Sequence, residues 1–145
     1  DERLALAKEH GVADITINPL KEDVEKIVLE QTYGRGADVV LEVAGGKNTF
    51  QTAWKVARPN AVVTIVALYE ESQALPLPDM YGKNLIFKTG GVDANACEDI
   101  LKLIACGKID TTYLITHTVK LKDIMDAYEM FENKEDGVIK VAIEP

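Results

Sequence analysis

The sequence predicts an α/β fold built around a doubly wound parallel sheet. Short apolar segments are followed by helical patterns in three successive repetitions. This alternation is typical of right-handed βαβ units, whose strands pair in parallel and whose helices cover the sheet. With 145 residues, 47% of them hydrophobic, the chain can build one buried core. No shift of composition marks a second domain, so we expect one unit.

The chain opens with a predicted helix, strand and second helix. Residues 2–10 (ERLALAKEH) can place leucine and alanine on one side of a helix that a glycine ends. Residues 13–18 (ADITIN) alternate apolar and polar side chains before Pro19, which predicts a short strand. A second helix is expected at about residues 21–33, where apolar side chains recur at helical spacing.

The next two predicted strands are the most apolar segments. Residues 38–43 (DVVLEV) and 61–68 (AVVTIVAL) are nearly continuous apolar runs, interrupted in the first only by Glu42. Such runs are typical of strands that are buried on both faces of a parallel sheet. Between them, residues 48–57 predict a helix, which the Arg-Pro-Asn segment at 58–60 is expected to close.

The remaining segments complete the pattern. Residues 70–83 contain prolines, which cannot donate to a strand ladder, so we expect a loop or a sheet edge. Strand character resumes at residues 85–89 (LIFKT). Two amphipathic helices are expected at 96–106 and about 121–133, each with its apolar side turned inward, and residues 138–143 (VIKVAI) predict the closing strand.

Charge and cysteine content narrow the function classes. Twenty-four acidic and sixteen basic residues give a net charge of -8, which repels nucleic acid and anionic lipid surfaces. No apolar run approaches the roughly 20 residues that a membrane span needs. Cys97 and Cys106 lack metal-ligand spacing, so we expect a reducing, cytoplasmic setting and no metal site in this chain.

No motif for independent catalysis is recognised. The G-x-S-x-G and H-E-x-x-H patterns are absent from the sequence, and His10 and His117 lie far apart. His117 could orient a cofactor or relay a proton, but a histidine beside a strand is more often structural. We therefore predict no catalytic residue and no metal ligand.

Small residues where apolar strands stop are the most informative feature. In open α/β sheets, ligands bind beyond the carboxyl ends of the strands. A glycine there lets a flat ring approach the backbone, whose N–H and C=O groups can bond a carboxamide. The alternative is that glycines at strand ends only make turns. Three such ends stand out: Ala44-Gly45-Gly46, Val66-Ala67-Leu68 and Phe87-Lys88-Thr89 before Gly90-Gly91.

Taken together, the segments resemble the coenzyme domain of zinc-type alcohol dehydrogenases of the medium-chain superfamily. The resemblance covers the whole chain, and its specificity comes from six pieces in the right order. These are ERLALAK at 2–8 with Gly11, GADVVLEVAG at 36–45, TIVAL at 64–68, TGG at 89–91, LITH at 114–117 and VIKVAI at 138–143.

The resemblance implies roles for individual residues in binding NAD or NADP. Arg3 falls where the family has a basic residue near the adenosine ribose. Lys140 falls where the family has a cation for the pyrophosphate, although a solvated strand-end lysine is the alternative. The other implied positions are strand ends: Ala44, Gly45 and Gly46 would border the adenine side and the nicotinamide ribose, and the backbones of Val66, Ala67, Leu68, Phe87, Lys88 and Thr89 would meet the nicotinamide carboxamide.

The sequence also departs from the family pattern. The family's domain begins with a strand, a G-x-G-x-x-G turn and a second strand, and none of these is present in the sequence. The resemblance therefore implies an incomplete Rossmann-type doubly wound sheet, with residues 1–145 as a partial nucleotide-binding domain. The strand at 13–18 would lose its neighbours. We hypothesise that a shifted strand order or pairing with another copy compensates.

The implied parent protein moves a hydride between a small alcohol and NAD or NADP, with zinc bound outside these 145 residues. We expect the chain alone to be inactive and to bind cofactor weakly. One alternative is a noncatalytic nucleotide-binding or dimerisation module, a homo-oligomer joined by the edge between Leu75 and Phe87. Another is a zinc-free, quinone-reductase-like member of the superfamily. The sequence leaves the substrate alcohol open.

Overall fold

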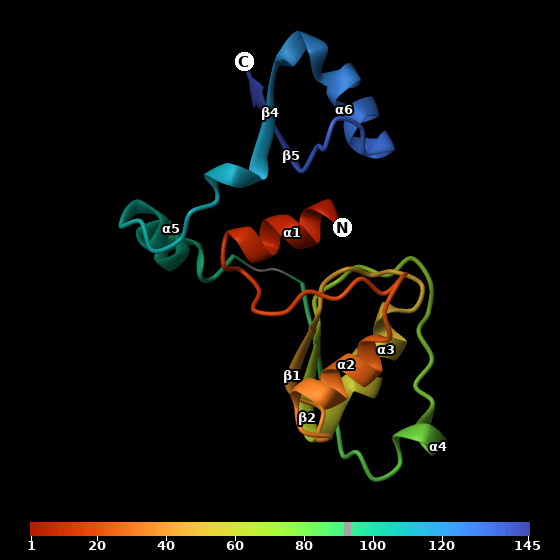
Figure 1. The fold of residues 1–145 in the computed structure, drawn as a ribbon. Helices are drawn as coiled ribbons and strands as arrows, with labels where there is room; N and C mark the ends of the chain where they lie inside the picture. Colours follow the sequence, from red (N-terminus) through yellow and green to blue (C-terminus); the bar gives the residue numbers. More distant parts are fainter. Residues whose placement is uncertain (92–93) are drawn as a thin grey trace. The chain divides into compact units, whose positions relative to one another are not determined.

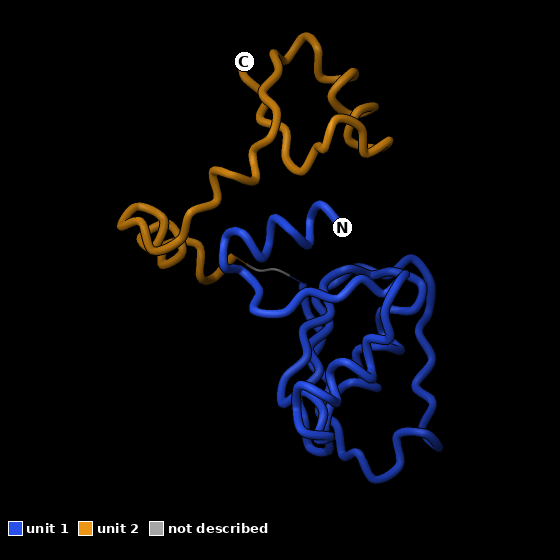
Figure 2. The backbone as a smooth tube through the Cα atoms, viewed as in Figure 1, with its two compact units in different colours: residues 1–92 blue, residues 93–145 orange. Residues whose placement is uncertain are grey.

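The fold is taken from a computed structural model, which describes residues 1–91 and 94–145. The chain divides into two compact units, residues 1–92 and 93–145 (Figure 2). Among the described residues, no helix is both long and apolar enough to cross a membrane.

The first unit contains a sheet of three parallel strands (Figure 1). They are β1 (Ala37–Glu42), β2 (Ala57–Ile65) and β3 (Ile86–Thr89), in the order β1-β2-β3. The register pairs Val40 with Val63, and Val63 with Phe87, so these three side chains share one face. The predicted parallel pairing of these three segments is confirmed.

A helix covers that face, and a second helix packs on the first. The first unit contains α1 (Glu2–Glu9), α2 (Val24–Gln31), α3 (Thr49–Val56) and the single-turn α4 (Leu77–Met80). Helix α3 packs on β1 and β2, and α2 packs on α3. The core consists of Ala53, Ala57, Ala61 and Val63, with Phe87 against it and the ring of Phe50 at 5.9 Å from that of Phe87.

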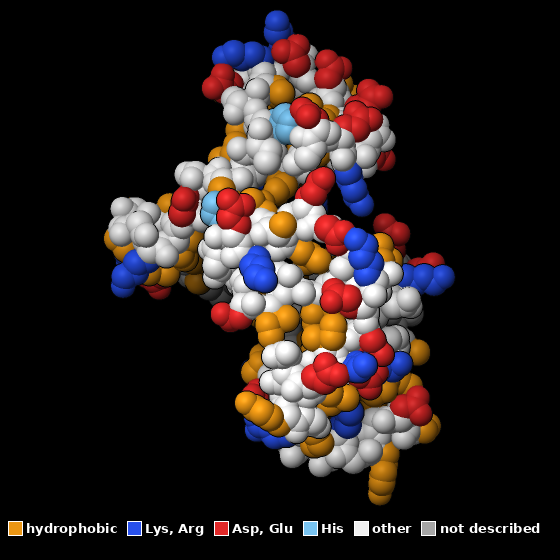
Figure 3. All heavy atoms as spheres, in the orientation of Figure 1, with side chains coloured by type: hydrophobic (Ala, Val, Ile, Leu, Met, Phe, Trp, Pro, Cys, Tyr) orange, Lys and Arg blue, Asp and Glu red, His pale blue; other side chains and the backbone are white. Residues whose placement is uncertain are grey.

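The opposite face of the sheet is exposed. Val39 and Leu41 keep 60% and 65% of their surface accessible, and Val43 and Ile86 are exposed as well. The expectation that the 38–43 strand is buried on both faces is therefore wrong for this chain. The reason is that α3 packs on the side of Val40 and Val63, whereas odd-numbered residues of β1 point to the other side. Figure 3 shows apolar side chains among the charged ones on the surface of the chain.

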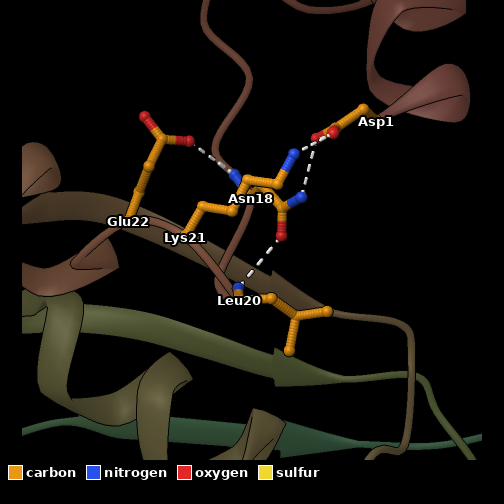
Figure 4. A network of polar contacts seen from close by, with 5 residues as sticks. All are labelled: Asp1, Asn18, Leu20, Lys21 and Glu22. Carbon is orange, nitrogen blue, oxygen red and sulfur yellow. Dashed lines mark hydrogen bonds and ion pairs between the residues drawn. The ribbon is translucent and has the colours of Figure 1, made fainter.

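The strand predicted at 13–18 is wrong, because this segment forms no ladder in the structure. Asn18, the last residue of the segment, makes three hydrogen bonds with side-chain atoms (Figure 4). Its amide N–H donates to Glu22 Oε2 at 2.8 Å, its Oδ1 accepts from the N–H of Leu20 at 3.0 Å, and its Nδ2 donates to Asp1 Oδ1 at 2.7 Å. Lys21 also pairs with Asp1. A shifted strand order that retains this strand is thus excluded, and pairing with another copy stays a hypothesis.

The junction between α3 and β2 also differs from expectation. Residues 58–60 do not lie outside regular structure but belong to β2, which begins at Ala57 and ends at Ile65. The register slips here, since Ala37 pairs with Ala57 but Val39 pairs with Val62. Lys83 stabilises the junction, because its Nζ donates to three carbonyl oxygens at the end of the helix: those of Trp54, Lys55 and Ala57, at 3.1, 2.7 and 2.8 Å.

The second unit pairs two parallel strands, β4 (Ile115–Lys120) and β5 (Lys140–Glu144). The sequence analysis gave no bounds for β4, although it took His117 to lie beside a strand. Helix α5 (Cys97–Ala105) and the short 3₁₀ turn η1 (Thr112–Leu114) precede β4. A second 3₁₀ turn, η2 (Leu121–Asp123), and helix α6 (Ile124–Asn133) connect β4 to β5. The apolar sides expected to point inward stay exposed, at Ile100, Leu101, Leu103 and Ile104 of α5 and at Met125, Tyr128 and Phe131 of α6. In α6 the buried side chain is Ala127.

Candidate functional site

Two of the three predicted strand ends meet at one edge of the sheet. Glu42 and Ile65 are register partners at the ends of β1 and β2, so the turns that follow lie side by side. The backbone oxygen of Glu42 accepts from the N–H groups of Val66 at 2.9 Å and Ala67 at 3.2 Å. Thr89 pairs with Ile65, so β3 ends at the same edge. This is the edge at which open α/β sheets bind ligands.

Glycine is required where the two turns touch. Gly45 has a φ of +67°, and a Cβ built on it would lie 2.5 Å from the carbonyl oxygen of Leu68. A side chain at this position would therefore need both a strained backbone and a displaced second turn. The glycine that the sequence singled out does more than end a strand, because it allows residues 44–46 to approach residues 66–68.

The two turns border a pocket of about 580 Å³, which we call the turn pocket. Its volume is in the range of small-molecule and cofactor sites. One cation, Lys47, and two carboxylates, Glu70 and Glu71, line it, so its rim carries both signs of charge. Its other lining residues are Ala44, Gly45, Gly46, Leu68, Tyr69 and Gln73.

A buried acid holds the first turn in place. Glu42 is only 5% exposed, and its Oε1 accepts from the N–H groups of Ala44 and Gly45, each at 3.0 Å. Burial raises the pKa of Glu42, but hydrogen bonding from Tyr69, Gly45, Ala44 and Thr49 outweighs it, so the net pKa lies below its ordinary value. Since these two amides are bonded to Glu42, they are not available to a ligand.

Two hydroxyl groups lie beside this carboxylate. Thr49 Oγ1 and the Tyr69 hydroxyl are 2.9 Å apart, and Thr49 Oγ1 donates to the carbonyl oxygen of Gly46, also at 2.9 Å. Both hydroxyls are close enough to influence the pKa of Glu42, yet Oε2 of Glu42 has no hydrogen bond of good geometry. Burial raises the pKa of Tyr69; the bond with Thr49 opposes the rise and the Glu42 carboxylate adds to it.

The other predicted site residues are distributed differently. The side chain of Phe87 packs against the core rather than toward the turn pocket, and Lys88 and Thr89 are exposed at the end of β3. Arg3 lies on α1 and does not line the turn pocket. Lys140 begins β5 in the second unit, where it lines a separate apolar hollow of about 260 Å³ beside α6. The roles of these residues in cofactor binding stay predictions.

Sequence reasoning missed Glu42, Thr49 and Tyr69 as parts of the site. Glu42 had a visible signal, since it is the single charged residue after the first position of an apolar strand. A carboxylate in such a run must be bonded or neutralised when it is buried. Thr49 and Tyr69 gave no signal, because their proximity depends on how α3 and the second turn pack.

His117 and the two cysteines belong to the second unit. His117 bonds through Nδ1 to Thr116 Oγ1 at 2.9 Å and through Nε2 to Asp136 at 3.2 Å, an arrangement that ties β4 to the turn before β5. Within residues 1–91 and 94–145, no group of three or more His, Cys, Asp or Glu side chains could hold a metal ion. Cys97 and Cys106 are free and exposed.

Solved structures share this fold over nearly the whole chain. A zinc dependent alcohol dehydrogenase 2 from Streptococcus pneumonia, in its apo form, superposes with a TM-score of 0.90 and 32% identity, covering 99% of this chain and 42% of that protein. A protein from Escherichia coli CFT073, described as a short chain alcohol dehydrogenase in complex with NADH, superposes with a TM-score of 0.85 and 27% identity, covering 97% and 41%.

Sequence comparison agrees. An alcohol dehydrogenase from Cupriavidus necator is 32% identical over 151 aligned residues, which cover 100% of this chain and 40% of that protein. The chain thus spans about 40% of the length of the relatives that it matches. A family model described as zinc-binding dehydrogenase matches residues 1–105. The chain belongs to the zinc-binding dehydrogenase family.

Proposed function

We propose that this chain is part of the NAD(P)-binding domain of a zinc-dependent alcohol dehydrogenase. The observation that carries the proposal is the turn pocket, where two glycine-containing or small-residue turns follow parallel strands at one edge of a sheet. Gly45 supports it further, since only glycine permits the close approach of these turns. The chain would supply the position of the nicotinamide cofactor rather than a reacting group.

The whole protein would transfer a hydride between a small alcohol and NAD or NADP. Zinc, bound by residues outside these 145, would polarise the alcohol oxygen when present. Relatives support the assignment: one is an NADP-dependent isopropanol dehydrogenase from Entamoeba histolytica, 31% identical, and the Escherichia coli structure contains NADH. Free, exposed Cys97 and Cys106 support a reducing, cytoplasmic setting.

Weak but localised NADH binding tests this proposal. We expect saturation-transfer NMR to detect NADH bound to the 145-residue chain with a Kd of roughly millimolar, because a chain that spans about 40% of the length of its relatives would offer the cofactor fewer contacts. Gly45→Val should abolish the signal, since its side chain would collide with the second turn. Gly11→Val is the matched control: its φ is +63° but no atom lies within 4 Å of a built Cβ. Equal signals from both variants would contradict the proposal.

We also propose that the chain forms a homo-oligomer through the edge between Leu75 and Phe87. Strand β3 is the terminal strand of the three-stranded sheet in the described part of the chain. An apolar hollow of about 530 Å³ flanks it, lined by Leu75, Leu77, Tyr81 and Phe87 among others. Leu77 and Tyr81 are strongly exposed. An apolar strand edge of this kind favours pairing with a second copy.

Analytical ultracentrifugation tests the oligomer. The wild-type chain should sediment as a dimer at concentrations where Leu77→Lys is monomeric, because the lysine would place a charge in the apolar contact. Leu20→Lys is the control, since Leu20 is a leucine in a turn that is even more exposed than Leu77, at 92% against 68%, and does not line this hollow. A wild-type chain that stays monomeric at every concentration would refute the oligomer.

A further inference from the structure

The two turns of the turn pocket have used backbone donors that an anion would need. Phosphate sites in α/β proteins are built from free backbone N–H groups. Here the N–H groups of Ala44 and Gly45 donate to Oε1 of Glu42. Those of Val66 and Ala67 donate to its backbone oxygen. None of these four N–H groups is free for a phosphate, so the turns are a poor site for the anionic part of a dinucleotide.

Carboxylates outnumber cations around the pocket. Glu70 and Glu71 line it, and Lys47 is the cation that opposes them. A third carboxylate, that of the 5% exposed Glu42, is hydrogen-bonded to the amides of the first turn, and its lowered pKa keeps it ionised at neutral pH. Because these amides are neutral donors, they stabilise the charge without cancelling it. A buried charge is screened less than an exposed one, so the field of Glu42 acts on the pocket through the first turn.

The oxidised nicotinamide ring is the part of a dinucleotide that matches this charge. The phosphates are anions, and the adenine and the riboses are uncharged at neutral pH. The nicotinamide ring is a cation in NAD⁺ and becomes neutral when it accepts a hydride. A pocket of about 580 Å³ is large enough for such a ring. The negative charge around the pocket therefore distinguishes the two redox states of one ring.

We propose that the turn pocket binds the oxidised, cationic nicotinamide ring more tightly than the reduced ring, and that Glu42, Glu70 and Glu71 set this preference. The inference rests on the proposed function, because it needs a nicotinamide cofactor in the pocket. It also has a consequence for the direction of hydride transfer. Since loss of a hydride creates the cation that the pocket stabilises, the bound NADH becomes a stronger hydride donor than free NADH.

Saturation-transfer NMR titrations with NAD⁺ and NADH test the preference. At low ionic strength we expect the wild-type chain to bind NAD⁺ roughly fivefold more tightly than NADH. The double substitution Glu70→Gln with Glu71→Gln should reduce this ratio to less than about twofold, and both side chains are exposed, so the fold should tolerate it. Glu42→Gln should also lower the ratio, since it removes a charge but keeps an acceptor for the two amides. Lys47→Gln should raise it.

Two controls separate the pocket from the charge of the whole chain. The net charge of -8 repels NADH, which carries one more negative charge than NAD⁺. Glu129→Gln with Glu132→Gln changes the net charge equally at exposed positions of α6 that do not line the pocket, so it should leave the ratio almost unchanged. The cation 1-methylnicotinamide and its neutral dihydro form carry no phosphate, and the cation should give the stronger saturation transfer.

The outcomes separate the two proposals. Equal affinities for NAD⁺ and NADH would overturn the redox preference while leaving cofactor binding intact. The same conclusion follows if the α6 control lowers the ratio as much as the Glu70 and Glu71 substitutions, or if the neutral dihydro form gives the stronger signal. A wild-type chain that binds neither NAD⁺ nor NADH would overturn the proposed function, and with it the preference.

Discussion

At the scale of single residues, one acid connects the sheet to the site. Glu42 is the last residue of β1, and its side chain accepts from the amides of Ala44 and Gly45 in the turn after the strand. Its backbone oxygen receives the two amides that follow β2. Glu42 therefore shapes both turns. The small residues in the turns also matter, because Gly45 lets the first turn approach the second. The sequence shows this acid plainly, but its partners become visible only once β1 and β2 are paired.

A second acid, Asp38, predicts how stability depends on pH. Its Oδ1 accepts from Arg58 Nε at 2.5 Å, which joins the start of β1 to β2. The hydrogen bond and the charge of Arg58 hold the pKa of Asp38 below its ordinary value of 3.8. A lowered folded-state pKa contributes stability above pH 3.8, and this contribution is lost as the pH falls through the folded-state pKa.

Asp38→Asn should therefore reduce the loss in the free energy of unfolding as the pH falls into the acid range. Urea midpoints of wild type and variant should differ at pH 6 and converge between about pH 4 and pH 2, because protonated Asp38 no longer pairs with Arg58. Added salt should reduce the difference at pH 6, since the pair is exposed. A constant difference over the whole range would show that the pair does not titrate as its geometry implies. Asp14→Asn, in an exposed bend, is the control.

At the scale of elements, the sheet has one covered and one open face. Val63 is 0% exposed between β1 and β3, while Val39, the neighbour of Val40 on β1, is 60% exposed. Strand periodicity places alternate residues on one face, and the register shows that Val40, Val63 and Phe87 share the covered one. It could not predict that one face stays uncovered, because a continuous apolar run looks the same whether one or two layers of helix pack on it.

Matched substitutions on the two faces test this asymmetry. Val63→Ala should lower the free energy of unfolding by about 2 kcal/mol, because it removes buried methyl groups and leaves a cavity. Val39→Ala removes the same atoms from a solvated face and should cost less than about 0.5 kcal/mol. Urea denaturation at constant m-value gives both numbers. Equal losses would mean that the face bearing Val39 is covered in solution.

Elements defined by strong periodicity were predictable, and those defined by tertiary pairing were not. The patterns at 2–10, 38–43 and 85–89 gave elements at nearly their observed positions. Residues 13–18 also alternate, but Asn18 bonds its own turn and Asp1 instead of a neighbouring strand. Strand β4 (ITHTVK) carries few apolar residues and is a strand because β5 lies beside it. Pairing partners distant in sequence decide such cases, and local pattern does not contain them.

At the scale of the whole molecule, two compact units carry different parts of the predicted cofactor contacts. The turn pocket belongs entirely to the first unit, whereas Lys140 belongs to the second. Turn glycines and strand ends are local signals, so the sequence could single out the residues of the two turns, whose role in cofactor binding stays a prediction. It could not predict the hydroxyl groups around Glu42, since these come from α3 and from the turn after β2, 7 and 27 positions further along the chain (49 − 42 and 69 − 42).

The chain also spans only about 40% of the length of its relatives, which sets a prediction for its activity. We expect the purified 145-residue chain to give no alcohol-dependent reduction of NAD or NADP above the buffer blank, even with zinc added. The physical reason is that hydride transfer needs the alcohol held and polarised against the ring, and positioning of one partner alone provides little of the rate enhancement.

The absorbance of the reduced nicotinamide, followed with a series of small alcohols, measures whether the chain turns over. The Cupriavidus necator alcohol dehydrogenase, assayed in parallel, shows that the conditions support turnover by a relative of full length. Turnover by the chain that Gly45→Val abolishes would contradict the prediction, because it would place a complete catalytic site within these residues.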